Sequence, residues 1–240
     1  MALPLSVSPI FSMTIPSTDK VVKYRPFVIR DEKALLIAQQ SEDPNVMIDT
    51  LKDVVKSCLK DSVDIDTLAT FDLEYMFTQI RAKSVGETID LIFPCDNDHG
   101  DDNEKAKTKI TFDLTEIKVH KPSGHNKKIE LFGDVGVVMK YPTIDVIRRI
   151  QDTQGNNLSE IFGVVVDCVD YIYEGDEIFY SKEQKREELL QFLENLTSDQ
   201  FSKIQQFFDT MPRIKQEVNY TCPICQKQHH KVLEGLASFF

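Results

Sequence analysis

The stretch Tyr220–Phe240 reads YTCPICQKQHHKVLEGLASFF, and it predicts a β-hairpin whose turn can bind a metal ion. Cys222 and Cys225 are two residues apart, a spacing that lets two thiolates approach one tetrahedral ion from a sharp turn. His229 follows Cys225 by four positions and adds a further donor. His229 and His230 are neighbours on a strand, so their side chains point to opposite faces and we do not expect both at one ion.

A structural zinc site usually takes four protein ligands, with the second pair supplied by a separate segment. Cys95 and His99 form another candidate pair, at the start of the acidic loop DNDHGDDNEK. We predict one structural zinc bound by Cys222, Cys225, His229 and Cys95, provided that the two segments meet. The alternative is a metal-free turn packed by its neighbours, and the sequence leaves both readings open.

The acidic loop lies between two stretches that alternate apolar and polar residues, as strands with one buried face do. Two further pairs of stretches predict antiparallel hairpins, because turn residues separate them. The expected strands cover Glu87–Cys95 and Lys107–Leu114, Lys127–Phe132 and Gly136–Pro142, and Ile10–Pro16 and Val21–Phe27, and a last one leads into the CxxC turn at Ile214–Thr221.

Helix periodicity and end signals predict the remaining elements. Asp43 is a suitable N-cap, and Pro44 fits the first helical position. Ser181 with Gln184, and Thr197 with Gln200, have the spacing of capping boxes. The expected helices cover Arg30–Gln40, Pro44–Cys58, Thr70 to just before Gly86, Thr143–Ile150, Leu158–Tyr173, Lys182–Leu196 and Ser198–Met211.

These elements predict an α+β fold of mixed helices and antiparallel hairpins with a C-terminal CxxC knuckle. We expect two domains. Residues 1–140 would form an N-terminal α+β domain of hairpin, three helices and antiparallel strands. Residues 141–240 would form a mainly helical lobe that ends in the zinc-knuckle-like hairpin.

Composition narrows the class of function. The 240 residues carry a formal net charge of -11, which disfavours a protein that tracks nucleic-acid phosphates. The apolar runs are too short to span a membrane, and the first residues lack the basic start of a signal peptide. Five cysteines, with Cys58 and Cys168 on apolar helical faces, indicate a reducing cytosolic compartment without a disulfide framework.

Motifs of catalysis are absent from the sequence. It contains no GxSxG, GxGxxG, Walker-type or HExxH pattern, so we expect no enzyme, no small-molecule substrate and no catalytic residues. An enzyme of unknown type stays an alternative. A zinc-ribbon module that binds nucleic acid or a polymerase is another, and it needs a cationic face that KQHHK barely supplies.

Two segments are candidates for protein contact. The chain end carries Leu236, Phe239 and Phe240, which either fold back into a core or dock on a partner. The second candidate is the turn at Arg25–Phe27, and the aromatic helix end QFFDTM fits protein contact as well.

Four stretches carry a wider similarity: KYRPF (23–27) followed by RDEKALLIA, TFDLEYMFTQIRAKSVGE (70–87), MKYP (139–142), and the closing C-x-x-C…H…LEGL-x-x-FF. Taken together and in this order, they resemble the baseplate hub proteins of T4-like contractile-tailed phages. The similarity covers nearly the whole chain, which makes it more specific than any one motif.

The resemblance implies a non-enzymatic role in building the central hub of the tail baseplate. Such proteins act either as chaperone-like assembly factors or as permanent hub subunits. The partners would be other baseplate hub proteins, with no nucleic acid and no membrane. The place of action would be the host bacterial cytoplasm during assembly or the virion baseplate. The resemblance implies nothing about zinc.

Overall fold

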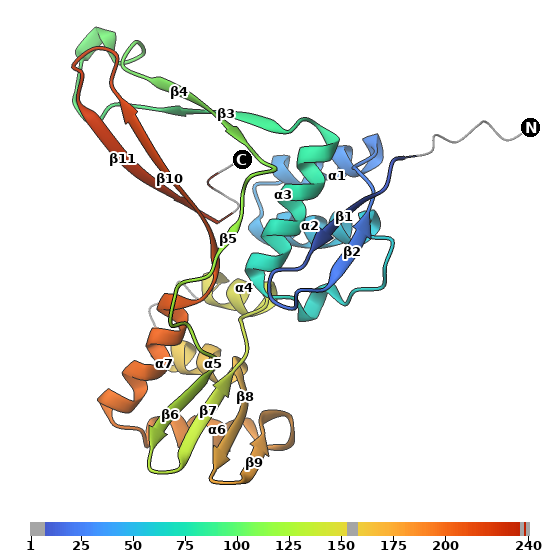
Figure 1. Ribbon diagram of the computed structural model, residues 1–240, viewed down its shortest axis with the longest axis vertical. Helices are drawn as coiled ribbons and strands as arrows, with labels where there is room; N and C mark the ends of the chain where they lie inside the picture. Colours follow the sequence, from blue (N-terminus) through green and yellow to red (C-terminus); the bar gives the residue numbers. More distant parts are fainter. Residues whose placement is uncertain (1–7, 153–157, 236–237, 239–240) are drawn as a thin grey trace, which may run out of the picture. The chain divides into compact units, whose positions relative to one another are not determined.

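The computed structural model describes residues 8–152, 158–235 and 238, and Figure 1 shows them as helices and antiparallel strands. The predicted α+β class is confirmed. The chain divides into two compact units. Unit 1 comprises Met1–Ile65, Phe71–His120 and Arg213–Phe240, and unit 2 comprises Asp66–Thr70 and Lys121–Pro212.

This division differs from the expected boundary after residue 140, because the C-terminal hairpin belongs with the first part of the chain. Strand β10 (Arg213–Thr221) pairs with β5 (Val119–His120) through Ile214 and Val119. Pairing between segments so far apart in the chain does not affect the local pattern of apolar residues. A domain boundary predicted from local elements therefore does not account for it.

The N-terminal part of unit 1 is a hairpin packed with helices. β1 (Phe11–Thr14) pairs antiparallel with β2 (Val21–Tyr24), as predicted. Helix α2 starts where the sequence predicts, because the Asp43 carboxylate accepts a hydrogen bond from the Asn45 N–H at 2.8 Å. The helices are α1 (Ile29–Gln40), α2 (Pro44–Cys58) and α3 (Thr70–Ser84), and a 3₁₀ turn at Ile65–Thr67 precedes α3.

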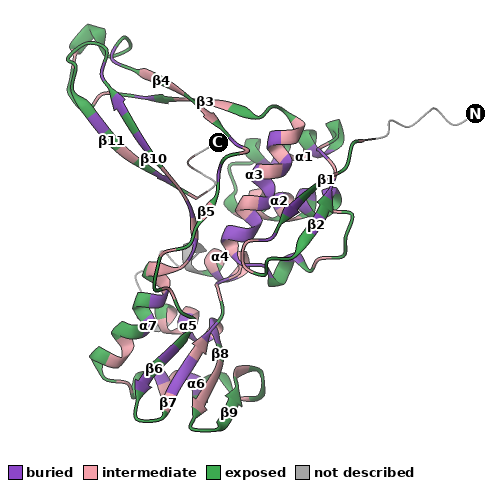
Figure 2. Cartoon of the chain, viewed as in Figure 1, coloured by how far each residue is buried: buried purple, intermediate pink, exposed green. Residues whose placement is uncertain are grey.

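Two further hairpins complete unit 1. β3 (Thr88–Phe93) pairs antiparallel with β4 (Thr108–Asp113), and β10 pairs antiparallel with β11 (Gln228–Glu234). Figure 2 shows few buried residues on β3 and β4. The core shared by this region consists of Ala82, Phe93, Leu114, Ile117, Ile214, Val218, Tyr220 and Leu233.

Unit 2 is a four-stranded antiparallel sheet with helices. The strand order is β6-β7-β8-β9, and the core gathers Leu131, Val137, Val165, Leu193 and Phe207 with their neighbours. The strands are β6 (Lys128–Phe132), β7 (Val135–Met139), β8 (Val169–Glu174) and β9 (Glu177–Tyr180). The helices are α4 (Ile144–Asp152), α5 (Leu158–Asp167), α6 (Arg186–Glu194) and α7 (Ser198–Thr210).

The predicted helix Leu158–Tyr173 is wrong in its second part. The helix ends at Asp167, and β8 begins at Val169. Gly175, at φ 57°, makes the turn from β8 to β9 in a conformation that glycine adopts without strain. A mostly apolar run fits a buried helix and a buried strand equally well, so periodicity alone does not place this boundary.

The two predicted capping boxes have different outcomes. Ser181 lies in a 3₁₀ turn, and α6 begins only at Arg186, where the Glu188 carboxylate accepts from the Lys185 N–H at 3.1 Å. The Thr197–Gln200 box is confirmed, with bonds of 2.8 and 3.3 Å. Within the residues described, no helix has the length and apolar character needed to cross a membrane.

Candidate metal centre

Four side chains of unit 1 each direct one ligand atom into a shared space. The sulfurs of Cys95, Cys222 and Cys225 and a ring nitrogen of His99 all lie within 4.8 Å of one another. Cys95 and His99 lie in the connection from β3 to β4, and the other two lie in the turn from β10 to β11 (Figure 1). Three of the four residues predicted for zinc therefore meet, and His99 joins them.

Two of the separations within this group are close to the edges of a tetrahedral zinc site. Cys95 Sγ lies 3.7 Å from Cys225 Sγ, and Cys222 Sγ lies 3.7 Å from His99 Nε2. A tetrahedron with Zn–S of about 2.3 Å and Zn–N of about 2.0 Å has S···S edges of about 3.8 Å and S···N edges of about 3.5 Å. The donor set fits zinc in atom type and in spacing.

The backbone shapes the turn around Cys222. The Cys222 N–H donates to the Lys227 carbonyl at 2.9 Å, and the Gln226 N–H donates to the Cys222 carbonyl at 3.1 Å. Gln226 itself has φ 58°, which lets the chain reverse at this point. The sulfur of Cys222 accepts from the Ile224 N–H at 3.4 Å. The turn thus presents the sulfur with an amide aimed at it, which favours the thiolate that a metal needs.

Burial and hydrogen bonding give the cysteines different acidities. Burial acts to raise the pKa of the Cys222 thiol, but the N–H groups of Cys225 and Ile224 outweigh it, and the pKa lies below its usual value. Burial raises the pKa of Cys95, and its cysteine neighbours add to this effect. Burial raises the pKa of Cys168 to about 12 and also raises that of Cys58. Cys58 and Cys168 therefore pack as thiols, apart from the centre.

His229, the fourth ligand predicted from sequence, lies beside the group. Its Nε2 is 3.3 Å from Cys95 Sγ, and its Nδ1 is 3.0 Å from Asp96 Oδ2. The ring is buried and stacks on Tyr220 with centroids 4.8 Å apart. His230 is exposed and contacts Asn219, so the prediction that the two histidines face opposite ways is confirmed.

The residues predicted for partner contact have other surroundings than expected. Arg25 Nη1 donates to Asp31 Oδ2 at 2.7 Å, and only 11% of the Arg25 side chain is exposed. Phe27 packs on Phe77 with ring centroids 5.6 Å apart. This turn therefore holds unit 1 together. Leu236, Phe239 and Phe240 lie outside the described residues.

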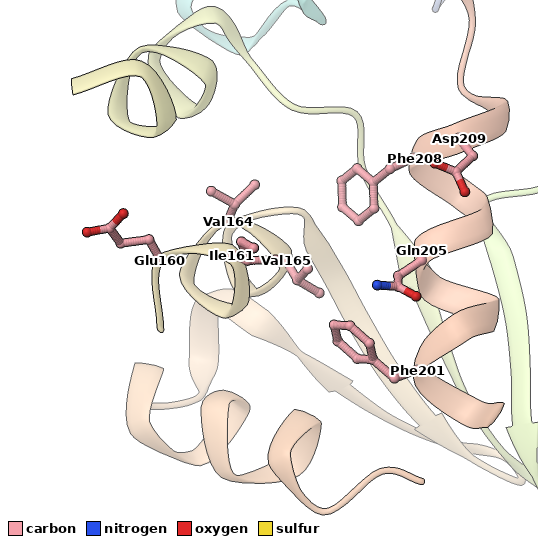
Figure 3. A pocket seen from close by; sticks show the side chains of 8 residues that line it. All are labelled: Glu160, Ile161, Val164, Val165, Phe201, Gln205, Phe208 and Asp209. Carbon is pink, nitrogen blue, oxygen red and sulfur yellow. The ribbon is translucent and has the colours of Figure 1, made fainter. Parts of the chain in front are cut away.

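Sequence reasoning did not identify an apolar groove in unit 2. Phe201, Gln205 and Phe208 of α7 face Val164 and Val165 of α5 across a space of about 440 Å³ (Figure 3). The α7 residues recur at positions i, i+4 and i+7, and this spacing in the sequence indicates that they lie on one face of the helix. The aromatic stretch QFFDTM contributes Phe208 to this groove.

Comparison with known proteins relates the chain to one family. No curated protein and no solved structure matches it. The family model described as T4 bacteriophage base plate protein matches residues 8–240. The match covers both units and all four residues of the metal centre. The chain therefore belongs to the T4 bacteriophage base plate protein family.

Proposed function

We propose that this protein is an assembly factor for the central hub of the phage tail baseplate. It acts in the host cytoplasm by transient contact with other hub proteins, and it is not an enzyme. The observation that carries the proposal is the family match along residues 8–240, which supports a role in the baseplate. The similarity of the quoted stretches to hub proteins narrows that role to the hub.

The surface of unit 2 supports protein contact. Ile178, Phe179 and Tyr180 of β9 are 49%, 37% and 41% exposed, and β9 is at the edge of its sheet. An exposed edge strand with apolar side chains is suited to contact with other chains. The net charge of -11 favours protein partners over nucleic acid.

The groove between α5 and α7 is a poor candidate for an active site. Its lining is apolar apart from Glu160, Gln205 and Asp209, and this set has no nucleophile paired with a base. It fits a role in contact better than a role in bond chemistry.

One structural zinc is the ion proposed for the metal centre. Four protein ligands complete a tetrahedron, so such a site has no open position for a substrate. A closed site of this kind supports folding, which agrees with a non-enzymatic protein. A zinc ribbon that binds nucleic acid is disfavoured because the chain has a net charge of -11 and Lys227 is the single cation of Cys222–Lys227.

The second candidate is a permanent hub subunit, which the description "base plate protein" favours. A phage lacking the protein, complemented by the wild-type gene, tests both candidates. Without the protein, we expect tails that lack hubs. With the wild-type gene restored, we expect mature particles, and mass spectrometry of the purified particles should not detect the protein. Its presence in mature particles in a fixed ratio to other hub proteins would establish the permanent subunit instead. Normal hubs in its absence would overturn both.

A further inference from the structure

We infer that the centre formed by Cys95, His99, Cys222 and Cys225 is a metal cross-link between two β-hairpins of unit 1. His99 is the fourth ligand, and His229 positions Cys95 from outside the ligand set. This inference rests on the proposed structural zinc. The ion joins the two hairpins, His99 binds it, and removal of the ion loosens both hairpins.

The two hairpins need a cross-link because they belong to different sheets. β3 and β4 form a two-stranded sheet alone, and β10 and β11 belong to a sheet with β5. No backbone ladder joins the hairpins, although every residue of these strands is described. A two-stranded hairpin alone has marginal stability in water.

Side-chain burial on the β3–β4 hairpin is also small. Phe93 is the single buried residue of the two strands, and it packs on Tyr220 with ring centroids 5.2 Å apart. Ile89, Leu91, Ile110 and Phe112 are only partly buried against the same core, so apolar packing offsets the entropy of ordering the two strands incompletely. The hairpin therefore depends on what fixes its end.

Contacts between the hairpins gather at the same end as the metal centre. The Tyr220 hydroxyl donates to the Pro94 carbonyl at 2.9 Å, and the Thr108 hydroxyl donates to the Thr221 carbonyl at 3.1 Å. The ligands are next to these residues in both segments. One ion bound there fixes two connections whose ligands Cys95 and Cys225 are 130 positions apart. Joining such distant segments restricts the unfolded chain strongly.

His99 is assigned as ligand because its nitrogen lies within 4.8 Å of all three sulfurs. His229 is not part of this mutually close group, although its Nε2 is 3.3 Å from Cys95 Sγ. Asp96 Oδ2 orients the His229 ring through Nδ1 at 3.0 Å. His229 thus contacts the Cys95 sulfur while the Asp96 carboxylate fixes its ring, and from this place outside the mutually close group it can hold Cys95 in position.

The test uses the full-length protein, purified under reducing conditions, with zinc measured by elemental mass spectrometry. The wild type should hold about one zinc per chain, and Cys95→Ser, Cys222→Ser and His99→Ala should lose it. His229→Ala should keep the stoichiometry at saturating zinc with roughly 10- to 100-fold weaker affinity. His230→Ala is the matched control, because this exposed histidine points away, and it should match the wild type.

Hydrogen exchange of the same samples locates the effect. A zinc chelator should speed amide exchange in Thr88–Asp113 and Arg213–Glu234, and leave the strands of unit 2 unchanged. Unchanged exchange in α2 and α3 of unit 1 shows that the cysteine variants are folded around the site, so zinc loss is then a property of the site. Cobalt added to the apo protein should give thiolate charge-transfer bands in the wild type and weaker bands in Cys222→Ser.

Three results would overturn the inference. They are wild-type protein without zinc, exchange unaffected by chelation, or zinc retained in His99→Ala and lost in His229→Ala. These measurements need no phage, so their failure is distinct from that of the proposed function. A metal-free protein that still complements the phage defect would retain the assembly role and remove only the cross-link.

Discussion

Cys95 Sγ lies 3.7 Å from Cys225 Sγ, although 130 positions separate the two residues in the chain. This contact links the connection after β3 to the turn after β10, and it involves the ends of two hairpins that share no sheet. The other cysteines, Cys58 and Cys168, are fully buried, and Cys168 belongs to the apolar core of unit 2. The five cysteines therefore separate into three that meet at one centre and two that serve packing.

The ion pair of Arg25 and Asp31 yields a first prediction. Only 5% of the Asp31 side chain is exposed, and its carboxylate accepts from Arg25 at 2.7 Å and from the Val28 N–H at 3.0 Å. Asp31→Ala should lower the free energy of unfolding by roughly 3 kcal/mol, because it leaves the guanidinium without its anion in a largely buried place. Urea denaturation followed by circular dichroism measures this loss. Glu104→Ala, at the exposed pair with Lys107, should cause a much smaller change. Equal losses in both variants would refute the role given to burial.

Acid sensitivity of the same pair is a second prediction. Burial alone would raise the pKa of Asp31, but hydrogen bonds from Arg25, Val28 and Ser57 outweigh it and hold the pKa below its usual value. The folded pKa is thus below the unfolded one of about 3.9, so the stabilisation is complete above that pH. It is lost as pH falls through the folded pKa. Unfolding free energies of the wild type should therefore decline more steeply below about pH 4 than those of Asp31→Asn. Parallel curves for the two proteins would show that Asp31 is not responsible.

Gly136 in β7 allows a third prediction. A Cβ at this position would overlap the Tyr173 phenol and lie 2.5 Å from the Ile129 carbonyl oxygen. Gly136→Ala should lower the free energy of unfolding by about 1–3 kcal/mol, because the backbone of β6 has to move. Gly163→Ala in α5 is the matched control. There a Cβ would meet only the flexible end of Arg186 at 3.1 Å, and alanine favours a helix by about 1 kcal/mol. Thermal unfolding should rank Gly136→Ala below the wild type and Gly163→Ala near it, and the opposite order would contradict the close approach.

The N-cap of α7 is the subject of a fourth prediction. The Thr197 hydroxyl accepts from the Gln200 N–H at 3.3 Å, and the Gln200 side chain accepts from the Thr197 N–H at 2.8 Å. Thr197→Ala should cost about 1 kcal/mol of stability because one helix N–H loses its acceptor. Ser198→Ala, one position later, should have little effect. Chemical denaturation of both variants checks this difference, and an unaltered midpoint for Thr197→Ala would show that the cap contributes nothing.

Local signals in the sequence predicted many elements of the fold. Helix α2 followed from Asp43, Pro44 and one apolar stripe, and the hairpins followed from alternation and turn residues. Strand β8 did not, because the run around Val165 and Val169 is mostly apolar, with Asp167 between them, and its pattern suits helix or strand. The return of β10 to β5 depends on contacts between distant segments, and no local period encodes it.

The candidate site was predictable in part for a similar reason. Sulfur spacing identified Cys222 and Cys225, and the need for a second segment identified Cys95. The choice between His99 and His229 depends on which ring reaches the three sulfurs, and the spacing of residues in the chain does not determine that.

X-ray absorption at the zinc edge, measured on the full-length wild-type protein, tests the cross-link most directly. The account predicts a four-coordinate ion with three sulfurs at about 2.3 Å and one nitrogen at about 2.0 Å. Three sulfurs require both hairpins, because the β10–β11 turn supplies two of the cysteines and the connection after β3 supplies the other. A first shell with two sulfurs or fewer, completed by oxygen or nitrogen, would mean that the three cysteines do not bind the ion together, and would contradict the predicted centre.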